Sequence, residues 1–97
     1  MFAVIFRAEI LELDAEYTAV AIRMRDLAIR EYGCVEFIYC TEGTNEVAIS
    51  YWENEEQIQQ WKQNPEHLLA QAQGRSRWYK SYTVQVLQVV RAYGSAT

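Results

Sequence analysis

The sequence has little of several features that would assign a class of protein at once. Its 97 residues include one proline, one histidine and two cysteines, and 9 basic residues stand against 13 acidic ones. The net charge of −4 disfavours nucleic acid as a partner, because phosphate binding needs clustered Lys and Arg side chains. No apolar run approaches the ~20 residues of a membrane helix, so we expect no membrane-spanning segment.

Two further absences argue against secretion and against a metal site. The N-terminal run MFAVIFRAEI has no basic leader before its apolar residues, so we expect no signal peptide. Cys34 and Cys40 have no second cysteine pair and no His at ligand spacing beside them, which argues against a zinc site. We therefore expect two buried free thiols and no metal. The length is that of a single domain, residues 1–97, and we expect that domain to be cytoplasmic.

Hydrophobic patterning predicts an α+β domain. Four segments have strand-like alternation or many β-branched residues, namely 2–11, 35–41, 46–52 and 77–93. Apolar residues at helical spacing predict a helix over 15–32 and a second helical region that follows Asn54 and stops at Gly74. This order predicts the ferredoxin-like βαββαβ fold, a four-stranded antiparallel sheet with both helices on one face.

Local signals place the ends of the predicted helices. Asp14 is suited to cap the first helix, and Asn54 with Gln57 has the spacing of a capping box. The pair Asn64-Pro65 joins a capping residue to the residue favoured at the first helical position. We therefore expect the second helical region to break at this pair.

Apolar side chains fall on both faces of the first and last predicted strands. The face away from the helices would then be a wide apolar surface in water, which a second copy of the chain would cover. We therefore expect a homodimer joined through this face.

The stretch 50–94 carries a series of motifs: a strand that ends in Trp, an acidic helix, a W-x-x-x-x-E-H segment, an A-Q-x-x-G-R turn and a closing R-x-Y. The residues concerned are Trp52, Trp61, Glu66, His67, Ala70, Gln71, Gly74, Arg75, Arg91 and Tyr93. This series resembles the antibiotic biosynthesis monooxygenase family of dimeric α/β barrels, and the resemblance covers nearly the whole chain. It implies a cofactor-independent, monooxygenase-like protein that acts on a small aromatic or quinol compound.

The resemblance also bears on cofactors. Members of the family divide into quinone-forming oxygenases, which need no metal or flavin, and haem-degrading oxygenases, which ligate haem through a His ten residues beyond a Trp. Trp61 matches that Trp, but the position ten beyond it is Gln71, and His67 comes four residues early. This departure from the family pattern implies that the chain binds no haem, and the resemblance to the quinone-forming members implies that it needs no other cofactor.

His67 is the candidate catalytic residue, because an imidazole with a pKa of about 6.5 can take a proton from a phenol. Its alternative role is that of a structural histidine near a helix N-terminus. The residues expected to line the substrate pocket are Trp52, Trp61, Arg75, Trp78 and Tyr79. The tryptophans could equally be core, and Arg75 could form a surface ion pair. Neighbouring strand residues face opposite ways, so only one of Trp78 and Tyr79 is expected in the pocket.

Three functions stay open on the sequence alone. The first is a monooxygenase acting on a small aromatic molecule, and the second is a non-catalytic, stress-related or binding protein that holds an apolar molecule. The third is a structural dimer module whose core has collapsed. A cavity separates the third from the first two, and oxygen uptake separates the first from the second.

Overall fold

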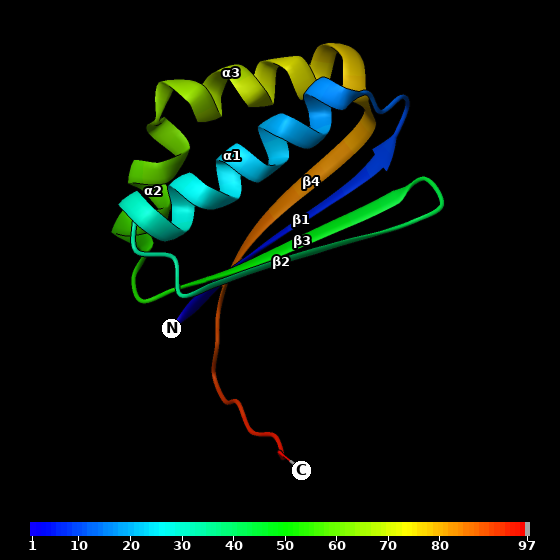
Figure 1. The fold of residues 1–97 in the computed structure, drawn as a ribbon. Helices are drawn as coiled ribbons and strands as arrows, with labels where there is room; N and C mark the ends of the chain where they lie inside the picture. Colours follow the sequence, from blue (N-terminus) through cyan, green and yellow to red (C-terminus); the bar gives the residue numbers. More distant parts are fainter. Residues whose placement is uncertain (97) are drawn as a thin grey trace.

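The chain folds into an antiparallel sheet with all its helices on one face (Figure 1), in a computed structural model that describes residues 1–96. The elements follow one another as β1 (Phe2–Ile10), α1 (Ala15–Glu31), β2 (Glu36–Glu42), β3 (Asn45–Trp52), α2 (Glu55–Gln63), α3 (Pro65–Gln73), a π-helical turn η1 (Gly74–Trp78) and β4 (Tyr79–Gln88). The strands pair antiparallel in the order β2-β3-β1-β4. The predicted ferredoxin-like fold is therefore confirmed.

The helices begin where their capping residues predict. The Asp14 carboxylate accepts a hydrogen bond from the backbone N–H of Tyr17 at 2.8 Å, and Asn54 forms both bonds of a capping box with Gln57. The Asn64 side chain accepts a hydrogen bond at 2.8 Å from the backbone N–H of Glu66, two residues further along the chain. Asn64 thereby ends α2 and caps α3, and the predicted break is confirmed.

The predicted end of the helical segment is confirmed, because α3 stops at Gln73, but the chain does not leave its helical path at Gly74. This residue has right-handed helical angles (φ −57°, ψ −48°), and the chain continues through it as the π-helical turn η1. A Cβ atom at this position would lie 2.7 Å from the ring of Tyr79, so glycine is needed here for close packing. The last strand consequently starts at Tyr79 rather than residue 77, and it ends at Gln88 rather than residue 93.

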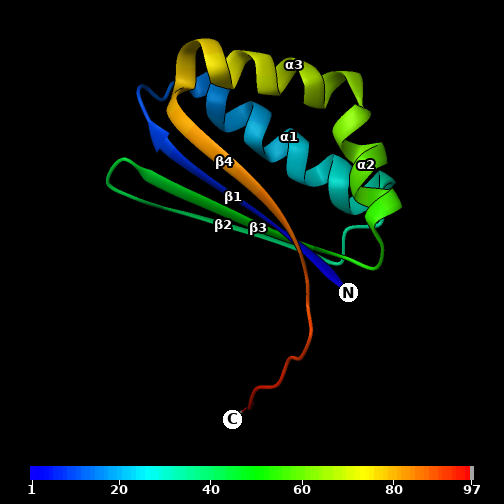
Figure 2. The same ribbon diagram turned by 180° about the vertical axis from the view of Figure 1, so that it is seen from behind.

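The sheet has one covered and one bare face. Figures 1 and 2 show α1, α2 and α3 on the same side, and no helix within residues 1–96 covers the other. On the bare face the strand register aligns Ile38, Ile49 and Ile5 in one row across β2, β3 and β1. None of the helices within this part of the chain is long and apolar enough to cross a membrane.

The two cysteines are free, but only one of them is buried. Cys34 packs in the core, whereas Cys40 is exposed. The expectation of two buried thiols fails at Cys40 because β2 is an edge strand, and Cys40 pairs there with Val47 on the bare face.

A dense core fills the space beneath α2. Its buried residues are Val4, Leu27, Ala28, Cys34, Trp52, Ile58 and Trp61. Trp52 has no exposed surface, and its indole Nε1 donates to the Ser50 hydroxyl at 2.9 Å. The rings of Trp52 and Trp61 lie 5.2 Å apart, so this core fixes the position of Trp61.

Candidate functional site

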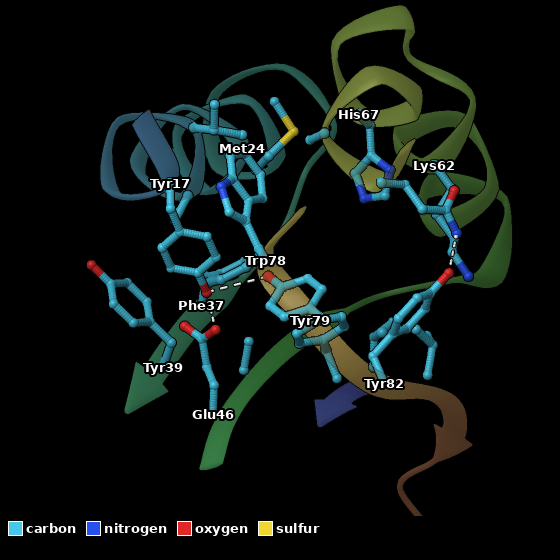
Figure 3. A pocket seen from close by; sticks show the side chains of 18 of the residues that line it. Tyr17, Met24, Phe37, Tyr39, Glu46, Lys62, His67, Trp78, Tyr79 and Tyr82 are labelled. Carbon is cyan, nitrogen blue, oxygen red and sulfur yellow. Dashed lines mark hydrogen bonds between the residues drawn. The ribbon is translucent and has the colours of Figure 1, made fainter. Parts of the chain in front are cut away.

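A cavity of about 160 Å³ lies between the sheet and helices α1 and α3 (Figure 3). Its aromatic walls are made by Phe6, Tyr17, Phe37, Tyr39, Trp61, Trp78, Tyr79 and Tyr82. Its charged or amide-bearing side chains are Glu46, Lys62, His67 and Gln71. An apolar protein cavity of ~150 Å³ holds a benzene molecule, so this one has room for about one aromatic ring. A structural module with a collapsed core is therefore excluded.

His67 enters the cavity from the first turn of α3, where the cap at Asn64 and the ring of Pro65 start the helix. Its imidazole packs edge-on against Trp61, with ring centroids 4.4 Å apart. Nδ1 is buried and has no hydrogen-bond partner within residues 1–96. Burial and the nearby charge of Lys62 lower the pKa of His67 from 6.5 to about 4. The imidazole is therefore neutral at pH 7.

Glu46 is a second buried titratable group in the cavity, and the sequence analysis missed it. The side chain is only 5% exposed, and its carboxylate accepts a hydrogen bond from the Tyr17 hydroxyl. The Tyr79 hydroxyl in turn donates to the Tyr17 oxygen at 3.2 Å. Within residues 1–96 no Lys or Arg forms an ion pair with this carboxylate.

Burial controls the protonation of this tyrosine–carboxylate group. Loss of water around Glu46 raises the pKa of its carboxyl above the usual range. Burial, and then the charge of Glu46, raise the pKa of Tyr79, so its hydroxyl stays protonated and can donate. The sequence did hold one signal of this site, because Glu46 has the same strand parity as Trp52, which faces the helices.

The predicted site residues do not all reach the cavity. Trp61, His67, Trp78 and Tyr79 line it, whereas Trp52 lies in the packed core and Arg75 is exposed on η1. Trp78 and Tyr79 both contribute, contrary to the expectation that only one would. The reason is that Trp78 belongs to η1, so the alternation of strand side chains does not apply to it.

Two indole groups leave hydrogen-bond donors unused at the cavity walls. The Nε1 atoms of Trp61 and Trp78 are buried without a partner among residues 1–96. Tyr17 meets Trp78 edge-on at 5.2 Å, and the Arg77 guanidinium stacks over the same indole at 5.1 Å. A buried N–H without a partner is costly, so a movement of either ring that brought its N–H to a ligand oxygen would be favoured.

The position that ligates haem in some relatives is occupied by an amide. Gln71 lines the cavity, and its Nε2 donates to the Tyr82 hydroxyl at 3.4 Å. Residues 1–96 contain no cluster of three or more His, Cys, Asp or Glu side chains arranged to hold a metal ion. The amide of Gln71, the imidazole of His67 and the carboxylate of Glu46 are groups that can hydrogen-bond to an organic molecule with hydroxyl or carbonyl oxygens.

Comparison with known proteins places the chain in a family. The sequence profile described as antibiotic biosynthesis monooxygenase matches residues 1–73. The uncharacterized protein YqjZ of Bacillus subtilis (strain 168) is 38% identical over 92 residues, which cover 93% of this chain and 80% of that protein.

Solved structures share the fold at lower identity. Rv0793 from Mycobacterium tuberculosis matches with a TM-score of 0.81 and 19% identity, covering 96% of this chain and 98% of that one. SnoaB from Streptomyces nogalater, a cofactor-independent oxygenase, matches with a TM-score of 0.80 and 15% identity, covering 97% of each chain. Together with the sequence matches, these likenesses show that the chain belongs to the antibiotic biosynthesis monooxygenase family.

Proposed function

We propose that the protein is a cofactor-independent monooxygenase that oxidises a small phenol or quinol inside the cavity. The observation that carries this proposal is the half-buried, neutral imidazole of His67, which lines an aromatic cavity the size of about one ring. Membership in the family, and the fold shared with the cofactor-independent oxygenase SnoaB, support the type of reaction.

In the proposed reaction His67 removes the phenolic proton and leaves a phenolate. The electron-rich ring passes one electron to O₂, and the resulting radical pair forms a new carbon–oxygen bond. The proton held by His67 goes to the outer oxygen and gives a hydroperoxide. When its O–O bond breaks, that oxygen leaves as water with the ring C–H proton, and the inner oxygen stays as a carbonyl. The substrate supplies all the electrons, so no cofactor is needed.

The cavity walls offer groups that would stabilise the charges of this reaction. The unpaired indole N–H groups of Trp61 and Trp78 are buried beside the cavity, and a rotation of either ring toward a phenolate or a peroxide oxygen would let it donate, in surroundings that exclude most water. Hydrogen bonds directed at a developing negative charge are strong in such surroundings, because the local dielectric constant is low.

One observation favours a second candidate function, the non-catalytic binding of the same class of molecule. A pKa of about 4 makes His67 a weak base toward a phenol, whose pKa is ordinarily about 10. Catalysis therefore requires that the phenolate raise the pKa of His67 by direct attraction once the substrate is bound. A binding protein would need no such coupling.

Oxygen uptake tests the proposal. The protein, treated with EDTA and free of added flavin, is mixed with a panel of single-ring phenols and hydroquinones, and O₂ consumption is followed beside quinone absorbance. We expect uptake of one O₂ per substrate consumed, above the rate with buffer. The His67→Ala variant, purified identically, controls for spontaneous oxidation and trace metal. If the protein binds these compounds but adds nothing to the background rate, the non-catalytic function is correct.

We further propose that the protein acts as a homodimer joined through its bare sheet face. The row of Ile38, Ile49 and Ile5 supports this, and the side chains of Ile38 and Leu87 are 48% and 40% exposed in the single chain. Light scattering at micromolar concentration should give twice the chain mass of 11.4 kDa. A monomer mass would contradict the dimer and leave the cavity chemistry untouched, because the residues that line the cavity come from one chain.

A further inference from the structure

We propose that Glu46 is a second ligand-binding group, which selects substrates that carry hydroxyl groups at opposite ends of a single aromatic ring. The inference rests on the proposed function for the chemistry and names the class of its substrate. Figure 3 shows Glu46 and His67 on opposite sides of the cavity. Glu46 rises from β3 in the sheet, and His67 comes from α3 in the helical layer. A flat ring between them would present one polar end to each.

The burial of Glu46 is the first observation behind this inference. A carboxylate that is 5% exposed and lacks an ion pair within residues 1–96 is costly unless hydrogen bonds compensate. Among these residues its one hydrogen bond comes from Tyr17. When it is ionised, this carboxylate has about four acceptor positions, so most of its capacity is left for a ligand that donates.

The direction of the hydrogen bonds is the second observation. Tyr79 donates to Tyr17, and Tyr17 donates to Glu46, so the carboxylate is the terminal acceptor of the chain. A ligand hydroxyl can donate to it. An ether or carbonyl oxygen at the same place would bring lone pairs against the carboxylate, and a site built to bind a hydroxyl discriminates strongly against analogues that lack it.

The size of the cavity limits the ring. A space of about 160 Å³ accommodates one aromatic ring, so the fitting class is hydroquinone (1,4-dihydroxybenzene) and its small ring-substituted derivatives. In the proposed reaction, hydroquinone and O₂ give hydroxyquinone and water. One oxygen atom enters a ring C–H bond, the other leaves as water, and the ring gives up four electrons.

Ligand binding without oxygen tests the role of Glu46. Quenching of tryptophan fluorescence, from Trp61 and Trp78 in the cavity wall, reports binding of hydroquinone and of 4-methoxyphenol under argon. The wild type should bind hydroquinone at least about tenfold more tightly, since hydrogen bonds to charged groups are worth more than neutral ones. Glu46→Gln should weaken hydroquinone binding by about tenfold and leave 4-methoxyphenol within about twofold.

Two further variants sharpen the test. Glu42→Gln makes the same chemical change at an exposed glutamate of β2 and should alter neither affinity. Tyr17→Phe removes the hydrogen bond to Glu46, and it should also reduce the preference for hydroquinone. This second variant keeps the test decisive if Glu46→Gln does not fold.

The outcomes separate this inference from the proposed function. If the preference for hydroquinone persists in Glu46→Gln, the methyl group of 4-methoxyphenol acts by bulk alone and the role of Glu46 is overturned, while oxygen uptake can still occur. If binding depends on Glu46 but no oxygen is consumed, the proposed function fails and the binding site stands. If neither compound quenches fluorescence, the assignment of the ligand class is overturned.

Discussion

The helix-facing side of the sheet has two halves of opposite character. Beneath α2 the space is filled, because Ile58 and Trp61 project from that helix into the core. Beneath α3 a cavity is left, and α3 itself buries no residue. An exposed ion pair between Arg23 and Glu66, at 2.8 Å, ties α3 to α1. The same sheet and the same α1 thus support a core or a cavity according to whether the covering helix supplies large apolar side chains.

The two halves also differ in whether their buried polar groups have hydrogen-bond partners. In the core half the one indole N–H of Trp52 has its partner in Ser50. In the cavity half Nδ1 of His67 and Nε1 of Trp78 lack partners among residues 1–96, and Glu46 is buried without an ion pair. Trp61, which borders both halves, has an unpaired Nε1 as well. Polar groups that are buried and incompletely bonded are costly, and they are typical of functional sites. The cavity half is therefore the half that we expect to act on a ligand.

The largest expected effect comes from removing a polar group of the cavity half, and it is an effect on turnover. His67→Ala should lower the rate of oxygen uptake by roughly 10²–10⁴-fold, the range for loss of a general base, with little change in unfolding free energy. Leu68→Ala, at the adjacent and 52% exposed position of α3, should leave the rate near wild type. Unchanged turnover in a folded His67→Ala protein would make His67 a structural residue.

A comparison of two tryptophans tests the difference in packing. Trp52→Ala, in the filled half, should reduce the free energy of unfolding by about 3–5 kcal/mol, because a large cavity replaces a fully packed ring. Trp78→Ala should cost less, at roughly 2–3 kcal/mol, because this ring borders a space that is already empty, so part of its surroundings is unpacked before the change. Urea denaturation with an unchanged m-value measures both. Equal losses would mean that the two halves are equally well packed.

The filled half was largely predictable from the sequence, because its signals are local. The caps at Asp14, Asn54 and Asn64 act through side chains on nearby backbone groups, and they behave in the structure as the sequence predicted. The apolar anchors Ile58 and Trp61 follow helical spacing, which fixes the face they present.

The cavity half was less predictable, because contacts between distant residues shape it. Gly74 read as a helix stop, yet its role is set by the ring of Tyr79 packed against it. Glu46 follows a polar turn and therefore resembles a solvent-exposed residue. It is buried only because α1 brings Tyr17 over the start of β3, a contact between residues 29 positions apart.

The dependence of stability on pH separates the two buried titratable groups of the cavity. The pKa of His67 is about 4 in the folded protein and about 6.5 unfolded, so between these values the unfolded chain binds more protons. Stability should therefore fall as the pH is lowered from 6.5 to 4, by about 3 kcal/mol from this residue. The raised pKa of Glu46 acts in the opposite direction, since its contribution is lost as the pH rises through the folded value.

Denaturation curves of the wild type and two variants across this range isolate each contribution. Relative to wild type, His67→Gln should remove the acid-side loss, and Glu46→Gln should remove the loss on raising the pH. All other groups titrate in all three proteins and cancel in the differences. Parallel curves for wild type and His67→Gln would show that the folded imidazole titrates normally and is not buried as described.

The smallest expected effect comes from adding a methyl group at Gly74, where η1 packs against the ring of Tyr79 in the cavity wall. Gly74→Ala places a methyl group 2.7 Å from the ring of Tyr79, which Phe6 and Tyr17 hold at centroid distances of 5.3 and 5.9 Å. Alanine suits the helical backbone of residue 74 better than glycine does, by about 1 kcal/mol, but the clash should outweigh this and leave a net loss of roughly 1–2 kcal/mol. Gly94→Ala, where a new Cβ meets nothing within 4 Å, is the matched control. If the tyrosine ring causes the loss, Gly74→Ala should become neutral or stabilising in a Tyr79→Ala background. A loss of stability that persists in the Tyr79→Ala background would come from η1 itself. The tyrosine ring, and with it the cavity wall, would then not be the reason for glycine at residue 74.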